Sequence, residues 1–410
     1  MFIFAAHNGT FACDRCCVEG KRVNGRTIFT TINDKKRTDE SFRNFENKEH
    51  HNGKTPLVEL KRSFNMIDQF CQDFMHLCCL GVMKKLLNEC WLSNEFGTRM
   101  SKINILKLTQ RMTNLTSQIP YEFQRQFTQN LALLGKWKAT ELRFFLLYCG
   151  PLVLKNLLPK GHYEHFLHLY VALRILCDKK MIKNNTYLDF AENLLQKFVL
   201  FFGKFYKLES MVLNVHSLLH LVDEVRYFKC CLSDLTAFPF ENALGYMKKR
   251  LRSGRKPLHQ YCSRITEENS LNEEKSSLPP ILEIITSSKT EVINKMHVTS
   301  IKFKDYFYTV KRPNNCVMLN SGDFCLISKM ESVAKNEITF YGKKLKLIEE
   351  AFEAPTKASD LNIHKVSECD TNCVNIKFTL QDICKKALYL KMFELDDDEG
   401  KEFYVIPMLH

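Results

Sequence analysis

The 410-residue sequence lacks a hydrophobic run long enough to cross a membrane. Its best apolar stretch, residues 144–158, is interrupted by Gly150, Pro151 and Lys155, whereas a spanning helix needs about 20 consecutive apolar residues. The opening residues MFIFAAHNGT have neither the basic start nor the length of a secretory signal. Internal repeats and low-complexity tracts are also missing. We therefore do not expect a membrane protein, a secreted protein or a repeat array.

Acidic residues are scarce relative to basic ones. The chain has 46 Asp and Glu against 59 Lys and Arg, and 59 − 46 gives a net charge of +13, which favours polyanionic partners such as nucleic acid. A hydrophobic content of 45% excludes a mostly disordered chain, and the length predicts two or more domains. The 17 cysteines are scattered, often at apolar positions, which indicates a reducing compartment with free or metal-bound thiols.

The periodicity of the first two thirds of the chain predicts mainly helices. Residues 1–66 are polar and irregular, with a turn signal at Asn24-Gly25. Residues 65–73 can run extended and helical spacing follows, so we expect Asp73 at a strand-to-helix junction. The spacing is helical almost throughout residues 103–228, and a further helix is expected from near Glu241 to around Gly254.

Beyond residue 267 the pattern changes. A polar, charged run that ends in two prolines predicts a linker, and the segments after it are short, β-branched or aromatic, with a period near two. The predicted fold class is therefore α+β, with an all-α block and a small antiparallel β-domain. The expected segments are an N-terminal core part (1–95), the all-α block (96–230), a core helix (231–266), the linker (267–280) and the β-rich domain (281–410).

Two pairs of residues have the spacing of zinc ligands. Cys13 and Cys16 form a C-x-x-C, from which two thiolates can reach one ion out of a tight turn. His216 and His220 lie four residues apart, which places both imidazoles on one face of a helix. Chance explains either pair taken alone, given the composition of the chain. Together they would complete a structural Cys₂His₂ site.

Asp73 and Glu241 are the candidate acids for chemistry. An Asp before a helix and a Glu in the first turn of a later helix can converge and hold Mg²⁺ or Mn²⁺ for attack on a phosphodiester. The alternative is structural, because acids at helix starts are favoured by capping and by the helix dipole.

A dense basic cluster follows Glu241. It comprises Lys248, Lys249, Arg250, Arg252, Arg255 and Lys256. Such a cluster is a candidate for binding the phosphate backbone of double-stranded DNA, and its alternative is a solvated helix face.

These motifs, in their order, resemble a known family. HNGTFACDRC, RTDESFR, DFMHLCCLGVMKKLL, WKATELRFFLLY, NVHSLLHLVDEVRYF, AFPFENALGYMKKRLRSGRKPL and the terminal IPMLH are similar to animal proteins related to CACTA-type (En/Spm-like) DNA transposases, over nearly the whole chain. The resemblance implies an RNase H-like core, interrupted by a helical insertion, in which three acids bind two divalent metals. It implies that Asp73 is the second acid and Glu241 the third, and that Cys13, Cys16, His216 and His220 are the family's C-x-x-C and paired histidines.

The chain also departs from the family pattern. The family's first acid lies upstream of the C-x-x-C block, but no Asp or Glu precedes Asp14 here. We therefore expect a truncated transposase-derived protein that is inactive as given, either an incomplete gene model or a decayed or repurposed copy. The alternatives are a non-catalytic DNA-binding or scaffolding protein, and a chain that makes no stable product. The expected partner is double-stranded DNA in the nucleus. Association into homo-oligomers is left as an alternative, and no small-molecule substrate is expected.

Overall fold

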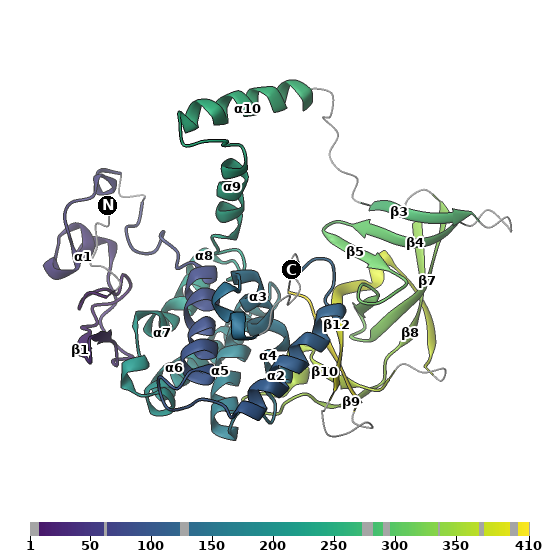
Figure 1. Cartoon of the computed structure of the whole chain (residues 1–410), viewed down its shortest axis with the longest axis horizontal. Helices are drawn as coiled ribbons and strands as arrows, with labels where there is room; N and C mark the ends of the chain where they lie inside the picture. Colours follow the sequence, from purple (N-terminus) through teal and green to yellow (C-terminus); the bar gives the residue numbers. More distant parts are fainter. Residues whose placement is uncertain are drawn as a thin grey trace.

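The computed structural model describes residues 8–60, 64–123, 131–272, 282–289, 296–334, 337–368, 373–393 and 401–409. The described part is mainly helical up to residue 272 and mainly β-strand beyond it (Figure 1). The α-helices are α1 (Asp39–Arg43), α2 (Lys102–Leu115), α3 (Ala139–Phe144), α4 (Gly150–Leu154), α5 (Lys160–Leu176), α6 (Asn185–Tyr206), α7 (Leu213–Ser217), α8 (Leu221–Phe228), α9 (Phe238–Lys249) and α10 (Pro257–Asn272). Stretches of π-helix are Met75–Met83, Leu86–Leu92 and Phe145–Cys149. Short 3₁₀ turns are Lys48–His50, Pro56–Glu59, Thr116–Gln118, Leu131–Lys136, Met181–Lys183, Leu208–Ser210, Leu218–His220, Ala358–Leu361 and Leu380–Asp382.

The strands begin with a short pair and continue after residue 281. They are β1 (Lys21–Val23), β2 (Arg26–Ile28), β3 (Leu282–Lys289), β4 (Met296–Phe303), β5 (Tyr306–Thr309), β6 (Cys316–Leu319), β7 (Phe324–Ala334), β8 (Glu337–Lys344), β9 (Leu347–Glu350), β10 (His364–Val366), β11 (Asn375–Thr379), β12 (Ile383–Phe393) and β13 (Lys401–Pro407).

The helices between residues 74 and 228, called the helical block below, surround the largest core. Residues 139–154 form one continuous helix although Pro151 lies inside it. Proline lacks an N–H, so the carbonyl four residues earlier loses its helical partner, and here the guanidinium of Arg174 on α5 donates to that carbonyl of Leu147 at 3.1 Å. Among the described residues, no helix combines the length and the apolar composition that crossing a bilayer requires.

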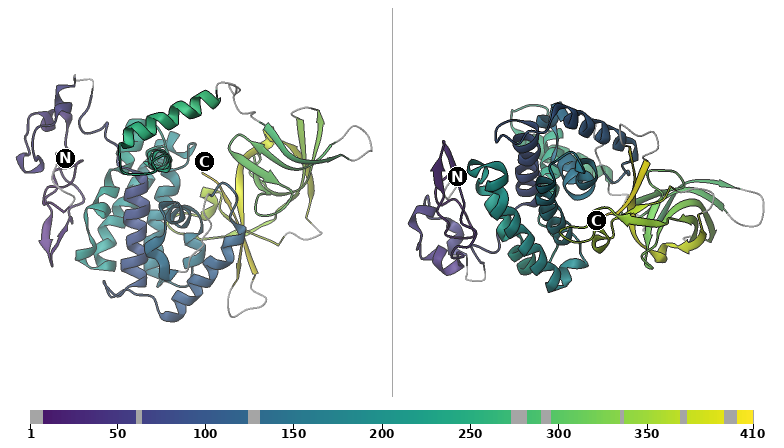
Figure 2. Two further views of the ribbon diagram at one scale, coloured as in Figure 1. Left: turned by 45° about the horizontal axis from the view of Figure 1, so that its top comes forward. Right: turned by 90° about the horizontal axis from the view of Figure 1, so that it is seen from below.

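Residues 8–60 lie along one side of the helical block, and the strands lie on the other (Figures 1 and 2). The β1–β2 hairpin turns at Asn24 and Gly25, both with positive φ (47° and 79°), which is the conformation that favours this dipeptide in two-residue hairpins. The turn predicted there is confirmed.

The later strands form one antiparallel sheet. Its order is β11-β8-β7-β6-β12-β13-β10-β9, with β4 also paired to β7 and with β3 and β5 paired to β4. Strand β12 joins the two halves, because it pairs with β6 near its start and with β13 along the rest of its length. The predicted antiparallel β-region is confirmed, and the chain is α+β.

One half of this sheet shares its core with the helical block. Along β12, Leu388, Leu390 and Met392 alternate with Ala387 and Tyr389, and the first three belong to the same buried cluster as the helices. The alternate residues face a second cluster within the sheet. Strands β12 and β13 are therefore packed on both faces, whereas β4–β8 and β11 enclose a further buried cluster that is made of sheet residues alone.

Three local expectations differ from the structure. Residues 64–73 form turns and irregular backbone, so the strand predicted before Asp73 is wrong, while the helix after it is confirmed. Helix α9 spans Phe238–Lys249 instead of 241–254. Helix α10 continues to Asn272, past the expected start of the linker at 267, and residues 273–281 of that linker lie outside the described residues. Before β3, the described strands are β1 and β2, so the RNase H-like sheet remains a proposal.

A buried ion pair connects the sheet to the helical block. Lys386 on β12 is fully buried, and its Nζ donates to both carboxylate oxygens of Glu122 at 2.8 and 2.7 Å and to Asn314 Oδ1 at 2.8 Å. Burial lowers the pKa of Lys386 to about 8, against the opposing effect of Glu122, so the amine stays protonated at neutral pH. Removing one partner would leave the other charge buried and uncompensated.

We predict that Lys386→Met lowers the free energy of unfolding by about 3–5 kcal/mol, because it leaves the Glu122 carboxylate buried without its cationic partner. The measurement is urea denaturation followed by tryptophan fluorescence. Both tryptophans, Trp91 and Trp137, lie in the helical block, so a shift caused by a β12 residue reports the shared core.

The double variant Glu122→Gln/Lys386→Met should recover most of the loss, because no charge is then left buried. Lys344→Met removes the exposed pair with Asp323 (2.9 Å) and should cost less than about 1 kcal/mol. Equal effects of Lys386→Met and Lys344→Met would contradict the prediction.

Candidate metal centre

Cys13 and Cys16 lie in a tight loop whose sulfurs point inward. The backbone N–H of Cys16 donates to the sulfur of Cys13 at 3.4 Å, which fixes the turn between them. Both cysteines are buried with Val18 and Phe29 in a small apolar cluster. The loop is further held by hydrogen bonds such as Gly20 N–H to the carbonyl of Thr10 at 2.7 Å.

His216 and His220 come from the helical block, where α7 passes into the 3₁₀ turn Leu218–His220. Their spacing of four residues keeps both rings on one side of the chain, and both are buried. The Phe29 ring of the N-terminal segment lies 5.9 Å from the ring of His216. The histidines therefore face the cysteine loop across the boundary between two segments that are 200 residues apart in sequence.

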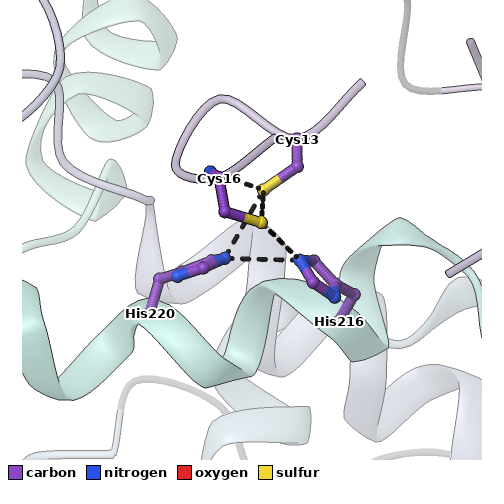
Figure 3. Close-up of side chains that lie close together, drawn as sticks. All are labelled: Cys13, Cys16, His216 and His220. Atoms are coloured by element: carbon purple, nitrogen blue, oxygen red, sulfur yellow. Dashed lines mark hydrogen bonds between the residues drawn. The ribbon is translucent and has the colours of Figure 1, made fainter. Parts of the chain in front are cut away.

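The four donor atoms converge on one point (Figure 3). The Sγ atoms of Cys13 and Cys16 are 3.5 Å apart, and the two Nε2 atoms of His216 and His220 are 3.3 Å apart. Cys13 Sγ lies 3.4 Å from His220 Nε2, and Cys16 Sγ lies 3.3 Å from His216 Nε2. With metal–sulfur and metal–nitrogen distances of about 2.3 and 2.0 Å, tetrahedral zinc would separate its ligands by about 3.3–3.8 Å. The site therefore fits a metal ion such as zinc.

The ionisation of the two thiols agrees with a ligand role. The hydrogen bond between the sulfurs is the largest influence on both, and it raises the pKa of Cys13 and lowers the pKa of Cys16. One thiol therefore ionises more readily than the other. A bound divalent cation would stabilise both as thiolates, because its charge lies beside the two sulfurs.

A line of polar contacts connects this centre to Asp73. Arg15, between the two cysteines, forms a buried ion pair with Glu224 of α8 at 2.7 Å. Burial raises the pKa of Glu224 to about 7, although Arg15 opposes the shift. The Glu224 carboxylate also accepts the backbone N–H of Gln72 at 2.9 and 3.0 Å, and Gln72 directly precedes Asp73. The loop that holds the cysteines thus also positions the backbone next to the candidate acid.

Asp73 caps a helix and contacts the start of α9. Its Oδ1 accepts the N–H of Met75 at 3.1 Å and the N–H of Ala237, the residue before α9, at 2.7 Å. Its Oδ2 accepts the backbone N–H of His76 at 3.1 Å and also contacts the His76 ring. Glu241 lies in the first turn of α9 and is exposed. Asp73 is therefore brought to the base of the helix that carries Glu241, and its observed role is capping.

The predicted basic cluster divides into two kinds of residue. Lys248, Lys249, Arg252, Arg255 and Lys256 are exposed at the end of α9 and in the turn before α10. Arg250 is instead buried in the corner between the helices, where it pairs with Glu268 and lies over the Tyr246 ring at 3.1 Å. Arg250 thus has a structural role in this corner.

The sequence reasoning missed the Arg15–Glu224 pair. A signal for Glu224 was present, because positions 216, 220 and 224 repeat at four-residue intervals and therefore share a helical face. Arg15 carried no comparable signal, since a basic residue inside a C-x-x-C is ordinarily exposed.

Comparisons with known proteins match only the C-terminal region. Residues 285–408 are similar to a family described as a domain of unknown function (DUF8592). These residues include nearly all of the antiparallel sheet. None of the curated proteins and none of the solved structures that were compared with the chain matches it.

We predict that the purified protein contains about one zinc ion per chain and that Cys13→Ser or His220→Ala removes it, because each change deletes one of four ligands. Elemental analysis measures the content. Replacement by Co²⁺ should give the intense visible bands of a tetrahedral thiolate site.

The matched control is Cys17→Ser, since Cys17 adjoins the site but its sulfur contacts Asn47 and no ligand. Its metal content should equal that of the wild type. Zinc retained in both Cys13→Ser and His220→Ala would exclude this centre.

Proposed function

We propose that this protein derives from a CACTA-type DNA transposase and that it binds duplex DNA in the nucleus. The observation that carries the proposal is the meeting of Cys13 and Cys16 with His216 and His220. The resemblance includes both the C-x-x-C and the paired histidines, although 200 residues separate them in sequence. If the motifs matched the family by chance, there would be no reason for their side chains to meet in space. The ion that we propose at this centre is structural zinc.

The position of Asp73 also supports this ancestry. In the proposed RNase H-like core, Asp73 and Glu241 are the remaining ligands of the ancestral Mg²⁺ or Mn²⁺ ions. The hydrogen bond from the N–H of Ala237 brings Asp73 beside the start of the helix that carries Glu241. The ancestral reaction would be metal-dependent cleavage and strand transfer at transposon ends.

We propose that the present protein binds DNA without cleaving it. Both oxygens of Asp73 already accept hydrogen bonds, three of them from backbone N–H groups of Met75, His76 and Ala237. A carboxylate that caps one helix and is tied to the start of another has few lone pairs left for an ion. This favours the non-catalytic DNA-binding interpretation over an active nuclease.

The proposed DNA-binding surface consists of four of the five exposed residues of the basic cluster. Lys249, Arg252, Arg255 and Lys256 lie within eight positions, and all four are exposed. Binding that depends on the phosphate backbone releases counterions, so it weakens steeply as salt rises and shows little sequence preference.

We predict that reversing all four charges (Lys249→Glu, Arg252→Glu, Arg255→Glu and Lys256→Glu) lowers the affinity for duplex DNA at least tenfold and reduces the slope of log K against log salt by up to about 3–4. Fluorescence anisotropy of a labelled duplex at several salt concentrations measures both quantities.

A control variant with the same change in net charge carries Glu at four exposed lysines of the C-terminal β-region, Lys302, Lys311, Lys346 and Lys377. It should bind DNA nearly as the wild type does. If both quadruple variants lose affinity equally, binding follows net charge alone and the proposed surface is wrong.

We predict that Asp73→Ala lowers the free energy of unfolding by about 1–2 kcal/mol, because a helix cap and a tie to α9 are lost. Glu241→Ala, at an exposed position, should change it by less than about 0.5 kcal/mol. Denaturant titration measures both.

The wild type should leave supercoiled plasmid intact in Mn²⁺. Nicking that is lost in both Asp73→Asn and Glu241→Gln would show an active nuclease instead.

A further inference from the structure

Among the described residues, helix α9 has little cover: Phe238 at its start is partly buried against the main core, and the corner with α10 contacts its far end. None of its 12 residues is buried, although a connection of only nine residues, 229–237, separates the helix from the well-packed helical block. Figures 1 and 2 show α9 projecting from the body, with α10 crossing at its far end. A single helix of this length is marginal in water without tertiary packing. Something must therefore pack against α9 if the helix is to be stable.

One side of α9 is apolar. Phe240, Leu244 and Met247 follow one another at intervals of four and three residues, so at 100° per residue they lie within an arc of about 60°. Their exposed fractions are 72%, 58% and 40%. Burying large apolar side chains of this kind contributes roughly 1.5–3 kcal/mol each. The alternation of four and three residues is also the spacing by which two helices pack side by side.

Charges along the apolar stripe indicate the partner. Glu241 and Lys248 lie seven residues apart, which places both on the same flank of the stripe, two turns from one another. When two identical helices pack antiparallel, the same flanks meet, so Glu241 of one copy faces Lys248 of the other, twice by symmetry. Parallel packing would set this flank against the opposite one, which carries Ala243, Tyr246 and Arg250, and the guanidinium of Arg250 is already paired with Glu268.

We propose that two copies of this chain associate through α9. The helices pack antiparallel, Phe240, Leu244 and Met247 form the apolar seam, and two Glu241–Lys248 ion pairs flank it. The partner is a second copy because the pattern is self-complementary. Each helix supplies one half of the apolar seam, the Glu241 of one ion pair and the Lys248 of the other.

The other flank of α9 is already occupied within the chain. Arg250 binds Glu268 of α10 and lies over the Tyr246 ring, and this corner holds α9 in place while leaving the seam open. Lys249 is on the side opposite the seam, and Arg252, Arg255 and Lys256 follow the helix. Association therefore leaves the proposed DNA-binding residues accessible and does not require DNA.

The size of the interface sets the expected strength. A 12-residue helix is about 18 Å long, so the paired helices alone form a contact at the small end of specific interfaces. We expect a reversible dimer whose population depends on protein concentration.

The experiment is sedimentation equilibrium of the full chain, without DNA, between about 1 and 100 µM. The mass should rise from the 48.0 kDa monomer towards twice that value. Leu244→Glu should remain monomeric throughout. Glu241→Lys or Lys248→Glu should each raise the dissociation constant about tenfold, because like charges then face each other. The double exchange Glu241→Lys/Lys248→Glu should restore association.

Leu106→Glu is the control, because Leu106 of α2 is 64% exposed but lies outside the seam, and it should associate as the wild type does. Circular dichroism of each variant confirms that the exposed substitutions leave the fold intact. A wild type that stays monomeric over the whole range would overturn the proposal and assign the seam to a different protein. Failure of the double exchange to restore association would overturn the antiparallel arrangement.

Discussion

The convergence of two thiols and two imidazoles is the constraint on which the N-terminal half of the structure depends. Residues 8–60 contain one short hairpin, one five-residue helix and few apolar residues, so they cannot form a core of ordinary size. Four ligand atoms within 4.8 Å of one another provide a cross-link between this segment and the helical block. A metal ion held there would stabilise the segment directly, because the unfolded chain offers no preformed site.

A series of contacts connects the same region to Asp73. Arg15 lies inside the cysteine loop and reaches Glu224, which binds the backbone of Gln72, and Asp73 in turn accepts the N–H of Ala237. Each of these three contacts joins residues that are more than 150 positions apart in sequence. The candidate acid, the start of α9 and the metal centre are therefore parts of one connected arrangement, although α9 itself leaves the body of the molecule.

On the opposite side, strands β12 and β13 share a core with the helices, while the rest of the sheet has buried clusters of its own. The pattern of β12 and β13, with apolar residues at consecutive positions, is typical of strands that are covered on both faces. From sequence these strands were predicted as part of a small β-domain, because strand periodicity gives no information about what packs on the second face. Lys386 illustrates the difficulty: a lysine is expected to be exposed, and its complete burial is explained by its contacts with Glu122, Asn314 and the carbonyl of Phe307.

The sequence by itself determined which parts of the chain are mainly helical and which form strands, and it determined the ligand chemistry of the candidate metal site. Helical periodicity, the Asn24-Gly25 turn and the spacing of Cys13 with Cys16 and of His216 with His220 are local, and local patterns act through the backbone of neighbouring residues. Only the tertiary structure decided that the two pairs meet, that Asp73 is used as a cap, that Arg250 is buried and that β12 faces the helices. Each of these outcomes depends on which surfaces pack together, and side chains hundreds of positions apart carry no local signal of one another.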